Sequence, residues 1–370
     1  MFRLKISILT LCLFLSGLSL TPLSAQTSAV YQVGNVGVDE TADSATEARK
    51  KAIASGQRLA FERLMTRLVP DGEREKLPPV DAATLESFIS GFEIKSEKNS
   101  TVRYIATLSF RFSSAAVRRF LRSANAGFSE TASKPLVVLP VLKQDATLTL
   151  WEEANPWRAA WQAQPVTDGL VPFILPGADP ANVGIISAEQ AMNGDQDRVD
   201  AITRKYGASD ALLAVATLRA DSASGDNILE LVVSRFGSAV TDRTEVSSFR
   251  GPAAAGPEAL MNQAAEQTIR KISEEWKINN QIRFDNRQTL DARISLSGLP
   301  DWLAIRSRLT KVAAVDRVEL RQLSRGEARV RLHYFGDNQQ LMLGMSQQNL
   351  VLAQGSVDWE ISASTRSTRP

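Results

Sequence analysis

Three tryptophans and two glutamates form the group of side chains that most resembles a ligand site. Trp151, Trp157 and Trp161 lie within eleven residues, and Glu152 and Glu153 stand between the first two. Two carboxylates can cleave a glycosidic bond when they face each other across ~5 to 9.5 Å, but adjacent carboxylates in a turn diverge. Aromatic residues at helical spacing usually serve burial. We therefore expect a packed core here, and the alternative is a Trp-lined groove that binds or cleaves a glycan such as peptidoglycan.

Basic side chains are the second group, and they lie on two segments near the carboxyl end. The segments "VDRVELRQL" and "EARVRLHYF" alternate in polarity, so every second side chain points to the same face of a sheet. We expect Arg321 and Arg331 to lie near each other across the hairpin, where like charges require an anion, either Glu319 or a partner. A solvated face is the simplest interpretation, and an anionic phospholipid or an acidic protein partner is the alternative. The candidate binding residues on this open face are Arg317, Arg321, Arg329, Arg331 and His333.

Motifs for other chemistries are missing from the sequence. It contains no phosphate loop, dinucleotide fingerprint, Gly-x-Ser-x-Gly elbow, Ser-x-x-Lys or HExxH pattern. His333 is the sole histidine. Asp195, Asp197 and Asp200 lack the spacing of a calcium loop, and Asp195 is better explained as a helix cap. The segment "DSASGDN", residues 221–227, predicts a hairpin turn. We therefore expect no catalytic residue, no metal and no cofactor.

The first residues determine the expected compartment. Residues 1–25 combine basic Arg3 and Lys5, an apolar run and a small residue before Gln26, which is the pattern of a cleaved signal peptide. Cys12 is the only cysteine and would leave with this peptide, and the small-residue motif of a lipoprotein is missing before it. Loss of the two basic residues brings the net charge from +2 to zero, which attracts no nucleic acid. We expect a soluble periplasmic protein.

The elements that would hold these side chains fall into three units. Unit one, residues 26–130, begins with an alternating strand and a long helix, which Ser44 caps in a box with Glu47. Small residues at helical spacing, among them Ala48, Ala52 and Gly56, predict close packing of this helix on strands. A short helix, a hairpin and a terminal helix follow and complete an α+β domain.

Unit two, residues 131–284, alternates helices with apolar runs. The run from Leu136 to Leu142 is typical of a strand covered on both faces in a mostly parallel sheet, and "GLVPFIL", "VGII", "DALLAVATL" and "NILELVVSRF" are similar runs. Asn155 followed by a proline predicts the start of the helix that carries Trp157 and Trp161 on one face. The alternation predicts a three-layer α/β domain.

Unit three, residues 285–370, has the element order βαββαβ and a short disordered tail. This order predicts a ferredoxin-like module with both helices on one face of the sheet. The side chains expected to point toward the helices are Val318, Leu320, Val330, Leu332 and Tyr334.

Several segments together resemble a known family. They are the leader, "SATEARKKAIASGQRLAFERLM", "PLVVLPVL" with "LWEEANPWRAAW", and "YGASDALLAVATL". They look like a proteobacterial envelope family catalogued as a domain of unknown function, over nearly all of the mature chain. Unit two is also similar at fold level to the amino-terminal domain of TolB and to curli-secretion-type proteins. The resemblance supplies no catalytic residues, and a shared fold does not carry function.

These patterns lead to one expected function and two alternatives. We expect a non-enzymatic exported protein that binds envelope protein partners, as an accessory factor in envelope assembly or maintenance. Its contacts would come from exposed sheet edges and from the arginine-rich face. The alternatives are glycan binding or cleavage at the tryptophans, with peptidoglycan contact, and anionic phospholipid binding by unit three, with peripheral membrane contact.

Overall fold

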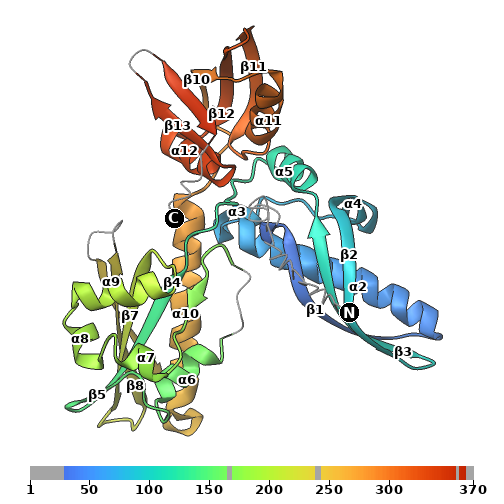
Figure 1. The fold of residues 1–370 in the computed structure, drawn as a ribbon. Coiled ribbons are helices and arrows are strands. Elements are labelled where there is room, and N and C mark those ends of the chain that lie inside the picture. Colours follow the sequence, from blue (N-terminus) through green and yellow to red (C-terminus); the bar gives the residue numbers. More distant parts are fainter. Residues whose placement is uncertain (1–28, 165–168, 238–242, 356–357, 364–370) are drawn as a thin grey trace, which may run out of the picture.

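The computed structural model describes residues 29–164, 169–237, 243–355 and 358–363. The expected signal peptide, residues 1–25, and the expected tail beyond residue 363 lie outside the described residues. Figure 1 shows three bodies of secondary structure that meet near one end of a long helix. We call them module one (residues 29–130), module two (131–284) and module three (285–363). No helix of the described part is long and apolar enough to cross a membrane.

Module one is an α+β structure in which one long helix lies on an antiparallel sheet. Its elements are β1 (Gln32–Thr41), α2 (Ala45–Leu68), α3 (Asp71–Arg74), α4 (Ala82–Phe88), β2 (Ile89–Asn99), β3 (Arg103–Phe112) and α5 (Ser114–Ser123), with the strand order β1-β3-β2. Ser44 caps α2, because its hydroxyl accepts from the Glu47 amide at 3.2 Å, which is one half of the predicted box. A Cβ on Gly56 would lie 2.9 Å from Leu108 Cδ1 of β3, so the helix approaches the strands as closely as the small residues predict.

Module two contains a mixed sheet. Its elements are β4 (Leu136–Gln144), β5 (Thr147–Thr149), α6 (Pro156–Gln162), β6 (Phe173–Ile174), α7 (Pro180–Val183), α8 (Ala188–Met192), α9 (Gln196–Lys205), β7 (Asp210–Ala220), β8 (Asn227–Gly237), β9 (Arg243–Gly251), a 3-10 turn (Ala253–Ala255) and α10 (Gly256–Asn279). The strand order is β5-β4-β7-β8-β9, with β6 beside β4. β4 and β7 are parallel, but β7, β8 and β9 form an antiparallel meander. The expectation of a mostly parallel sheet is therefore wrong, because a hairpin turn joins β7 to β8 where a parallel pair would need a longer crossover.

Two of the apolar runs of module two are not full strands. Of "GLVPFIL" only Phe173–Ile174 pairs in the sheet. The segment "VGII" contains the last residue of α7 and a turn, so the expectation of a strand there is wrong. Ile186 at its end is nevertheless fully buried in the core. Burial therefore explains Ile186 but not Val183, which is 46% exposed.

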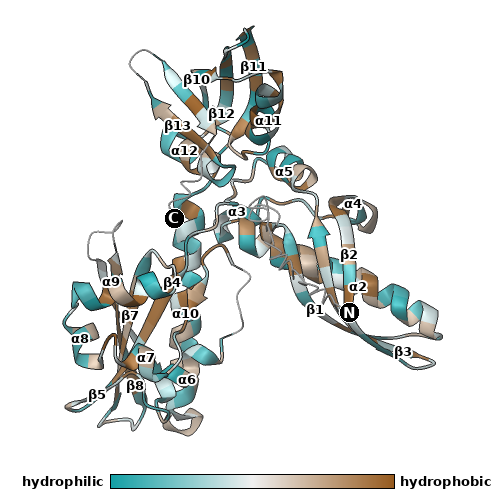
Figure 2. Cartoon of the chain, viewed as in Figure 1, coloured by the Kyte–Doolittle hydropathy of each residue, from teal (hydrophilic) through white to brown (hydrophobic). Residues whose placement is uncertain are grey.

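Helices cover both faces of the sheet, which confirms the predicted three-layer arrangement. On one face, alternate residues of β4 such as Leu136 and Val138 pack with α6 and α10. On the other face, Val137 and Leu139 pack with α8 and α9. Figure 2 shows the strong hydrophobicity of the central strands between these helices.

Module three keeps the predicted element order up to its last strand. Its elements are β10 (Arg287–Ser295), α11 (Leu299–Leu309), β11 (Val315–Leu323), β12 (Glu327–Phe335), α12 (Asn338–Gln347), β13 (Leu350–Gln354) and β14 (Trp359–Ala363). Both helices contribute to a single core on the sheet. The expected final strand is instead a hairpin, and β14 lies between β13 and β10, parallel to β10. Residues 356–357 of the expected strand lie outside the described residues.

The inward side chains of module three follow the predicted alternation with one correction. Val330, Leu332 and Tyr334 of β12 are buried, and Val318 of β11 is half-buried. Leu320 is 43% exposed, so its expected place under the helices is wrong. β11 is the edge strand, and its register against β12 shifts just after Leu320, so this end of the strand lies outside the covered area.

A buried lysine joins modules one and two. Lys277, near the end of α10, donates from Nζ to the carbonyl oxygens of Thr66 and Val69 at 3.0 and 3.1 Å. These carbonyls stand at the carboxyl end of α2, where a helix presents unpaired acceptors and partial negative charge. Glu274, one turn earlier on α10, pairs with Lys277 at 2.7 Å and accepts from the Asp71 amide at 2.8 Å. Residues at the end of α10 therefore supply the hydrogen-bond partners that the carboxyl end of α2 and the segment after it would otherwise lack.

Two arginines of α5 join modules one and three, and we call this contact the arginine joint. Arg118 forms two bonds with the Glu130 carboxylate, at 2.9 and 2.6 Å, and donates to the Lys311 carbonyl oxygen at 3.1 Å. Burial disfavours the charged guanidinium, but Glu130 and Tyr31 outweigh this, so the pKa of Arg118 is raised. Burial, followed by the Glu130 charge, raises the pKa of Tyr31, whose hydroxyl donates to Glu130.

The second half of the arginine joint combines an ion pair with aromatic contacts. Arg122 pairs with Asp316 at 2.6 Å. Its guanidinium also lies 5.6 Å from the ring centre of Phe284 and 5.3 Å from that of Phe335. The two rings pack edge to face at 5.2 Å. A cation near two rings gains from both, so this contact fixes α5 against Phe284 at the end of module two and against Phe335 of module three.

Candidate functional site

The three candidate tryptophans lie inside module two. All are 9% exposed or less. Trp157 and Trp161 pack edge to face on the α10 side of the sheet, with ring centres 5.7 Å apart, while Trp151 belongs to the core on the α8 and α9 side. The Trp157 indole donates to the Ala214 carbonyl at 2.9 Å, and the Trp151 indole donates to that of Ile186 at 2.8 Å. The rings therefore hold helices and loops to the sheet, and they do not form the open platform that glycan stacking requires.

The neighbouring glutamates do not converge on a common point. The Glu152 carboxylate accepts from the backbone amides of Leu150 and Trp151 at 2.7 and 3.0 Å, so it stabilises its own turn. Glu153 is exposed. As predicted, Asn155 then caps α6 by accepting from the Arg158 amide at 3.0 Å. These roles explain the polar residues around the tryptophans without catalysis.

The side chains Arg317, Arg321, Arg329, Arg331 and His333, which we call the arginine face, lie on β11 and β12 of module three. Arg331 forms two bonds of 2.7 Å with the Asp291 carboxylate of β10, and Arg329 bonds Glu327 at 2.8 Å. Arg321 pairs with Glu319 at 3.0 Å, and His333 Nε2 lies 3.2 Å from the same carboxylate. Arg317 lies 3.0 Å from His333 Nε2. Every member of the arginine face therefore has a polar partner within the module.

The pairing of the arginine face differs from the expectation in one respect. Glu319, not Arg321, stands opposite Arg331 in the register of β11 and β12. The register shift after Leu320 moves Arg321 out of the expected position, so the two arginines do not face each other directly. Glu319 is therefore the compensating anion, as the sequence analysis had suggested as one of two possibilities.

Charge pairing also changes the acidity of this face. The bond from Arg331 lowers the pKa of the Asp291 carboxyl, and the bond from His333 lowers that of Glu319, in each case against a small cost of burial. The pKa of Arg329 is raised by its bond to Glu327. These shifts all favour the charged forms, so the face holds its ion pairs at neutral pH.

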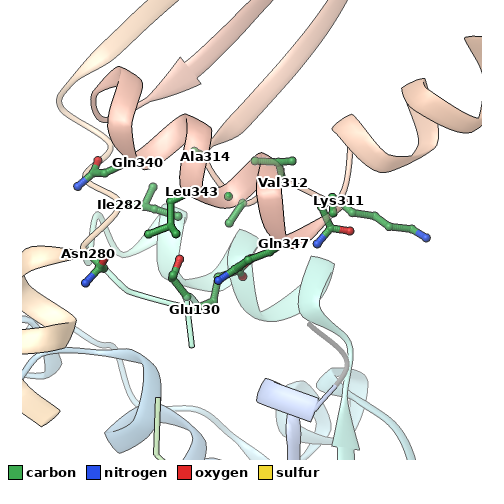
Figure 3. A pocket seen from close by; sticks show the side chains of 13 residues that line it. Glu130, Asn280, Ile282, Lys311, Val312, Ala314, Gln340, Leu343 and Gln347 are labelled. Atoms are coloured by element: carbon green, nitrogen blue, oxygen red, sulfur yellow. The ribbon is translucent and has the colours of Figure 1, made fainter. Parts of the chain in front are cut away.

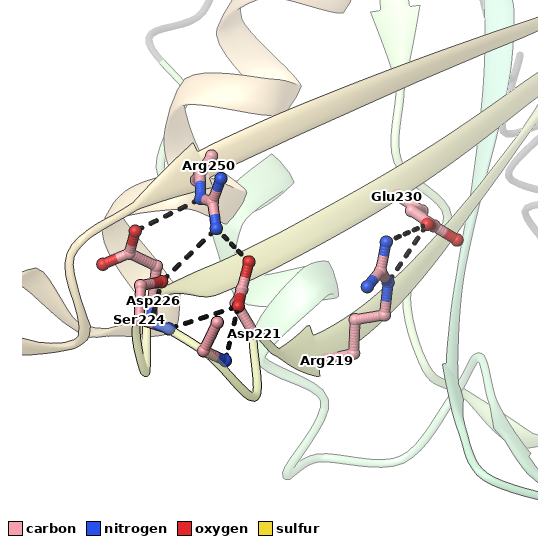
Figure 4. Close-up of polar contacts among 7 residues, drawn as sticks. Arg219, Asp221, Ser224, Asp226, Glu230 and Arg250 are labelled. Atoms are coloured by element: carbon pink, nitrogen blue, oxygen red, sulfur yellow. Dashed lines mark hydrogen bonds and ion pairs between the residues drawn. The ribbon is translucent and has the colours of Figure 1, made fainter.

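The two aspartate-rich segments have structural roles. Asp195 caps α9 as predicted, accepting from the Arg198 amide at 3.3 Å. Residues 221–226 form the predicted turn between β7 and β8, and Asn227 is the first residue of β8. Figure 4 shows Arg250 of β9 reaching Asp221 and Asp226 in this turn. Among the described residues, no three His, Cys, Asp or Glu side chains gather as a metal site would require.

A small cavity lies where module three meets the rest of the chain. Figure 3 shows Gln340, Leu343 and Gln347 of α12 around this cavity, with Ile282 beside Leu343 and Glu130 below them. Its volume of about 20 Å³ accommodates a single water molecule. This cavity is therefore a packing gap at the module boundary and leaves no room for a ligand.

A larger cavity, of about 200 Å³, lies between the sheet of module two and the last turns of α10. Sequence reasoning missed it, because its walls come from segments far apart in the chain and no local pattern joins them. The lining residues are Ser133, Lys134, Leu136, Val171, Leu212, Val233, Arg235, Glu245, Lys271, Ile272, Glu275, Trp276 and Asn279.

The sheet edges differ in how well they are protected. β2 and β11 each show two register shifts against their neighbours and carry basic residues, while β13 has only five residues. β9 pairs with β8 in an unbroken register, and no strand of the described part pairs with its other edge. Val246 in the middle of β9 is 73% exposed. β9 therefore combines an unpaired edge with an unbroken register, although like β2 and β11 it carries basic residues, Arg243 and Arg250.

Comparison with known proteins places only module one in a family. Residues 27–130 match the family model described as Domain of unknown function (DUF8605). The expectation of a family without known function is confirmed for this part of the chain. No curated protein matches the sequence. The likeness of module two to TolB and to curli-secretion-type proteins stays a prediction.

Solved structures give only distant likenesses. A dodecamer of a PelC variant from Paraburkholderia phytofirmans is 10% identical, with a TM-score of 0.26 over 38% of this chain and 89% of that one. The lipoprotein GNA1162 from Neisseria meningitidis is 14% identical, with a TM-score of 0.24 over 37% and 94%. Protein XCC0632 from Xanthomonas campestris is 14% identical, with a TM-score of 0.18 over 40% and 85%. At these scores the likenesses support no conclusion about this chain.

Proposed function

We propose that this protein is an exported periplasmic accessory factor of the cell envelope that acts by binding another protein. The leader pattern of residues 1–25 supports export. The unpaired edge of β9, with its unbroken register and exposed Val246, is the observation that carries the binding proposal. An extended segment of the partner adds to this edge as a further strand of the module two sheet.

The geometry of β9 suits this mode of binding. Main-chain bonds along a free edge give affinity without demanding a particular sequence, and side chains at alternate positions give selectivity. Opposite β8, Glu245, Ser247 and Phe249 share the face that α10 covers, because Phe249 pairs with buried Leu229. Val246 and the residues at even positions lie on the other face. The partner strand would therefore meet an exposed valine on that face.

Neither alternative function has a specific observation in its favour. The tryptophans of the glycan alternative are buried on two opposite faces of a sheet. The arginines of the phospholipid alternative are paired with carboxylates of their own module, and a lipid phosphate would have to displace those partners. Protein binding through β9 requires no such rearrangement.

The experiment places a photocrosslinking residue at Ser248 of the full chain in living cells. We expect a discrete crosslinked product with an envelope protein. Val246→Lys, which puts a charge on the edge strand, reduces this product about tenfold, because a buried charge opposes strand addition. Val351→Lys on the edge strand β13 is the matched control and leaves the product unchanged. Absence of a product, or equal loss with both substitutions, contradicts the proposal.

A further inference from the structure

The 200 Å³ cavity of module two has an apolar floor. The floor joins the beginnings of β4 and β7, the end of β8 and the last turns of α10. An apolar cavity of about 150 Å³ can hold a benzene molecule, so this one has room for an aromatic ring or a short alkyl chain. The apolar lining residues are Leu136, Val171, Leu212, Val233, Ile272 and Trp276.

The charged residues of the cavity lining are three cations and two carboxylates: Lys134, Arg235, Lys271, Glu245 and Glu275. The cations differ in whether a carboxylate already pairs with them. Arg235 is bound to Asp210, with Nε 3.0 Å from Oδ2, and Lys271 pairs with Glu245 at 2.5 Å. Lys134 is exposed, and no ion pair among the described residues engages it. A lysine beside an apolar floor selects ligands that carry an anion at one end of a hydrocarbon body.

We propose that this cavity binds a small carboxylic acid with an apolar body, of the size of benzoate or octanoate. The hydrocarbon part lies against the floor formed by Leu212, Ile272 and Trp276. The carboxylate accepts a hydrogen bond from the Lys134 ammonium at the rim. The inference does not rest on the proposed protein binding, because Val246 lies on the face of the sheet opposite the cavity, although its neighbour Glu245 lines the cavity.

Calorimetric titration of the full chain with octanoate tests the proposal. We expect saturable binding at one site and about tenfold weaker binding of octylammonium, because a second cation at the rim replaces a charge-assisted bond by repulsion. Lys134→Glu weakens octanoate binding about tenfold. Lys134 lies just before β4, and Lys143→Glu, at the far end of β4, is the matched control and leaves octanoate binding unchanged.

Two substitutions that fill the cavity test the floor separately. Val233→Phe and Ile272→Trp each place a larger side chain in the space of the hydrocarbon part and abolish binding, and an unchanged circular dichroism spectrum shows that the variant is folded. The proposal is overturned if octanoate does not bind, if octylammonium binds equally well, or if a folded filled variant still binds. Val246→Lys leaves octanoate binding intact, so failure here is distinguishable from failure of the β9 proposal.

Discussion

The arginine joint and the arginine face use the same chemistry in different surroundings. In both, guanidinium groups form paired bonds to carboxylates. The side chains of Arg118 and Glu130 in the joint are 16% and 5% exposed, whereas those of Arg331 and Asp291 on the face are 38% and 58% exposed. The sequence drew attention to the face, where the arginines are dense. The joint has only two, at a spacing of one helical turn, yet these hold two modules together.

Burial determines what each pair contributes. A buried ion pair that loses one partner leaves an uncompensated charge in a poorly solvated site, which is strongly destabilising. An exposed pair exchanges its partner for water and contributes little. The comparison therefore predicts that substitution of an arginine costs most stability in the buried part of the arginine joint and least on the exposed arginine face.

The largest effect is expected for Arg118→Ala. It leaves the buried Glu130 carboxylate without its bidentate partner and lowers the free energy of unfolding by about 3 to 5 kcal/mol. Denaturant unfolding of the full chain measures this loss in the first transition. Arg119→Ala, an exposed neighbour on the same helix, is the control and stays within about 0.5 kcal/mol of the unsubstituted protein. Equal effects of the two substitutions would remove the distinction between joint and surface.

An intermediate effect is expected for Arg122→Ala. The substitution removes a partly exposed ion pair and two contacts with aromatic rings, which together cost about 1 to 2 kcal/mol. Because these contacts connect α5 to module three, the amides of residues 280–287 at the boundary exchange faster with deuterium. Mass spectrometry of the exchanged peptides measures this change. The control is Arg306→Ala, at an exposed position of α11, and faster boundary exchange in that variant as well would argue against a specific contact.

The smallest effect on stability is expected on the arginine face. Substitution there changes the pKa of a carboxyl group more than it changes stability. Arg331 lowers the pKa of Asp291 in the folded protein. The contribution of this pair is therefore present above the ordinary pKa of aspartate and is lost as the pH falls through the lowered value. Arg331→Ala returns the Asp291 pKa toward its ordinary range and changes the melting temperature at pH 7 by no more than about 2 °C.

Carboxyl chemical shifts in an NMR titration report the Asp291 pKa directly. Arg325→Ala, in the exposed turn between β11 and β12, is the matched control and leaves this pKa where it is. A large loss of stability with Arg331→Ala, comparable to that of Arg118→Ala, would show that the face is as important to the fold as the joint.

Local signals in the sequence were sufficient for many individual elements. Ser44 and Asn155 identified helix starts because capping involves residues that are neighbours in the chain. The small residue Gly56 predicted a close helix approach, since the space it leaves is filled from strands of the same module. The tryptophans were expected in a core because of their spacing, and their burial follows that expectation.

Features that depend on contacts between distant segments could not be predicted from local sequence patterns. The register shift after Leu320 and the insertion of β14 beside β10 depend on pairing between strands, which alternation alone does not specify. The cavity beside α10 requires residues from Ser133 to Asn279 to come together. The arginine joint was missed for the same reason, because Arg122 meets Asp316 only after the modules dock.

The position of Lys277 affects whether module one is stable when it is separated from the rest of the chain. The family match ends at residue 130, but the positive charge that neutralises the end of α2 is supplied from nearly 150 residues further along the chain. A fragment cut at that boundary would expose two carbonyl oxygens and lose their cation. A protein that carries this domain beside other domains would have to provide another cation in place of the Lys277 ammonium group. A basic residue near the carboxyl end of α2 would then show which domain provides it.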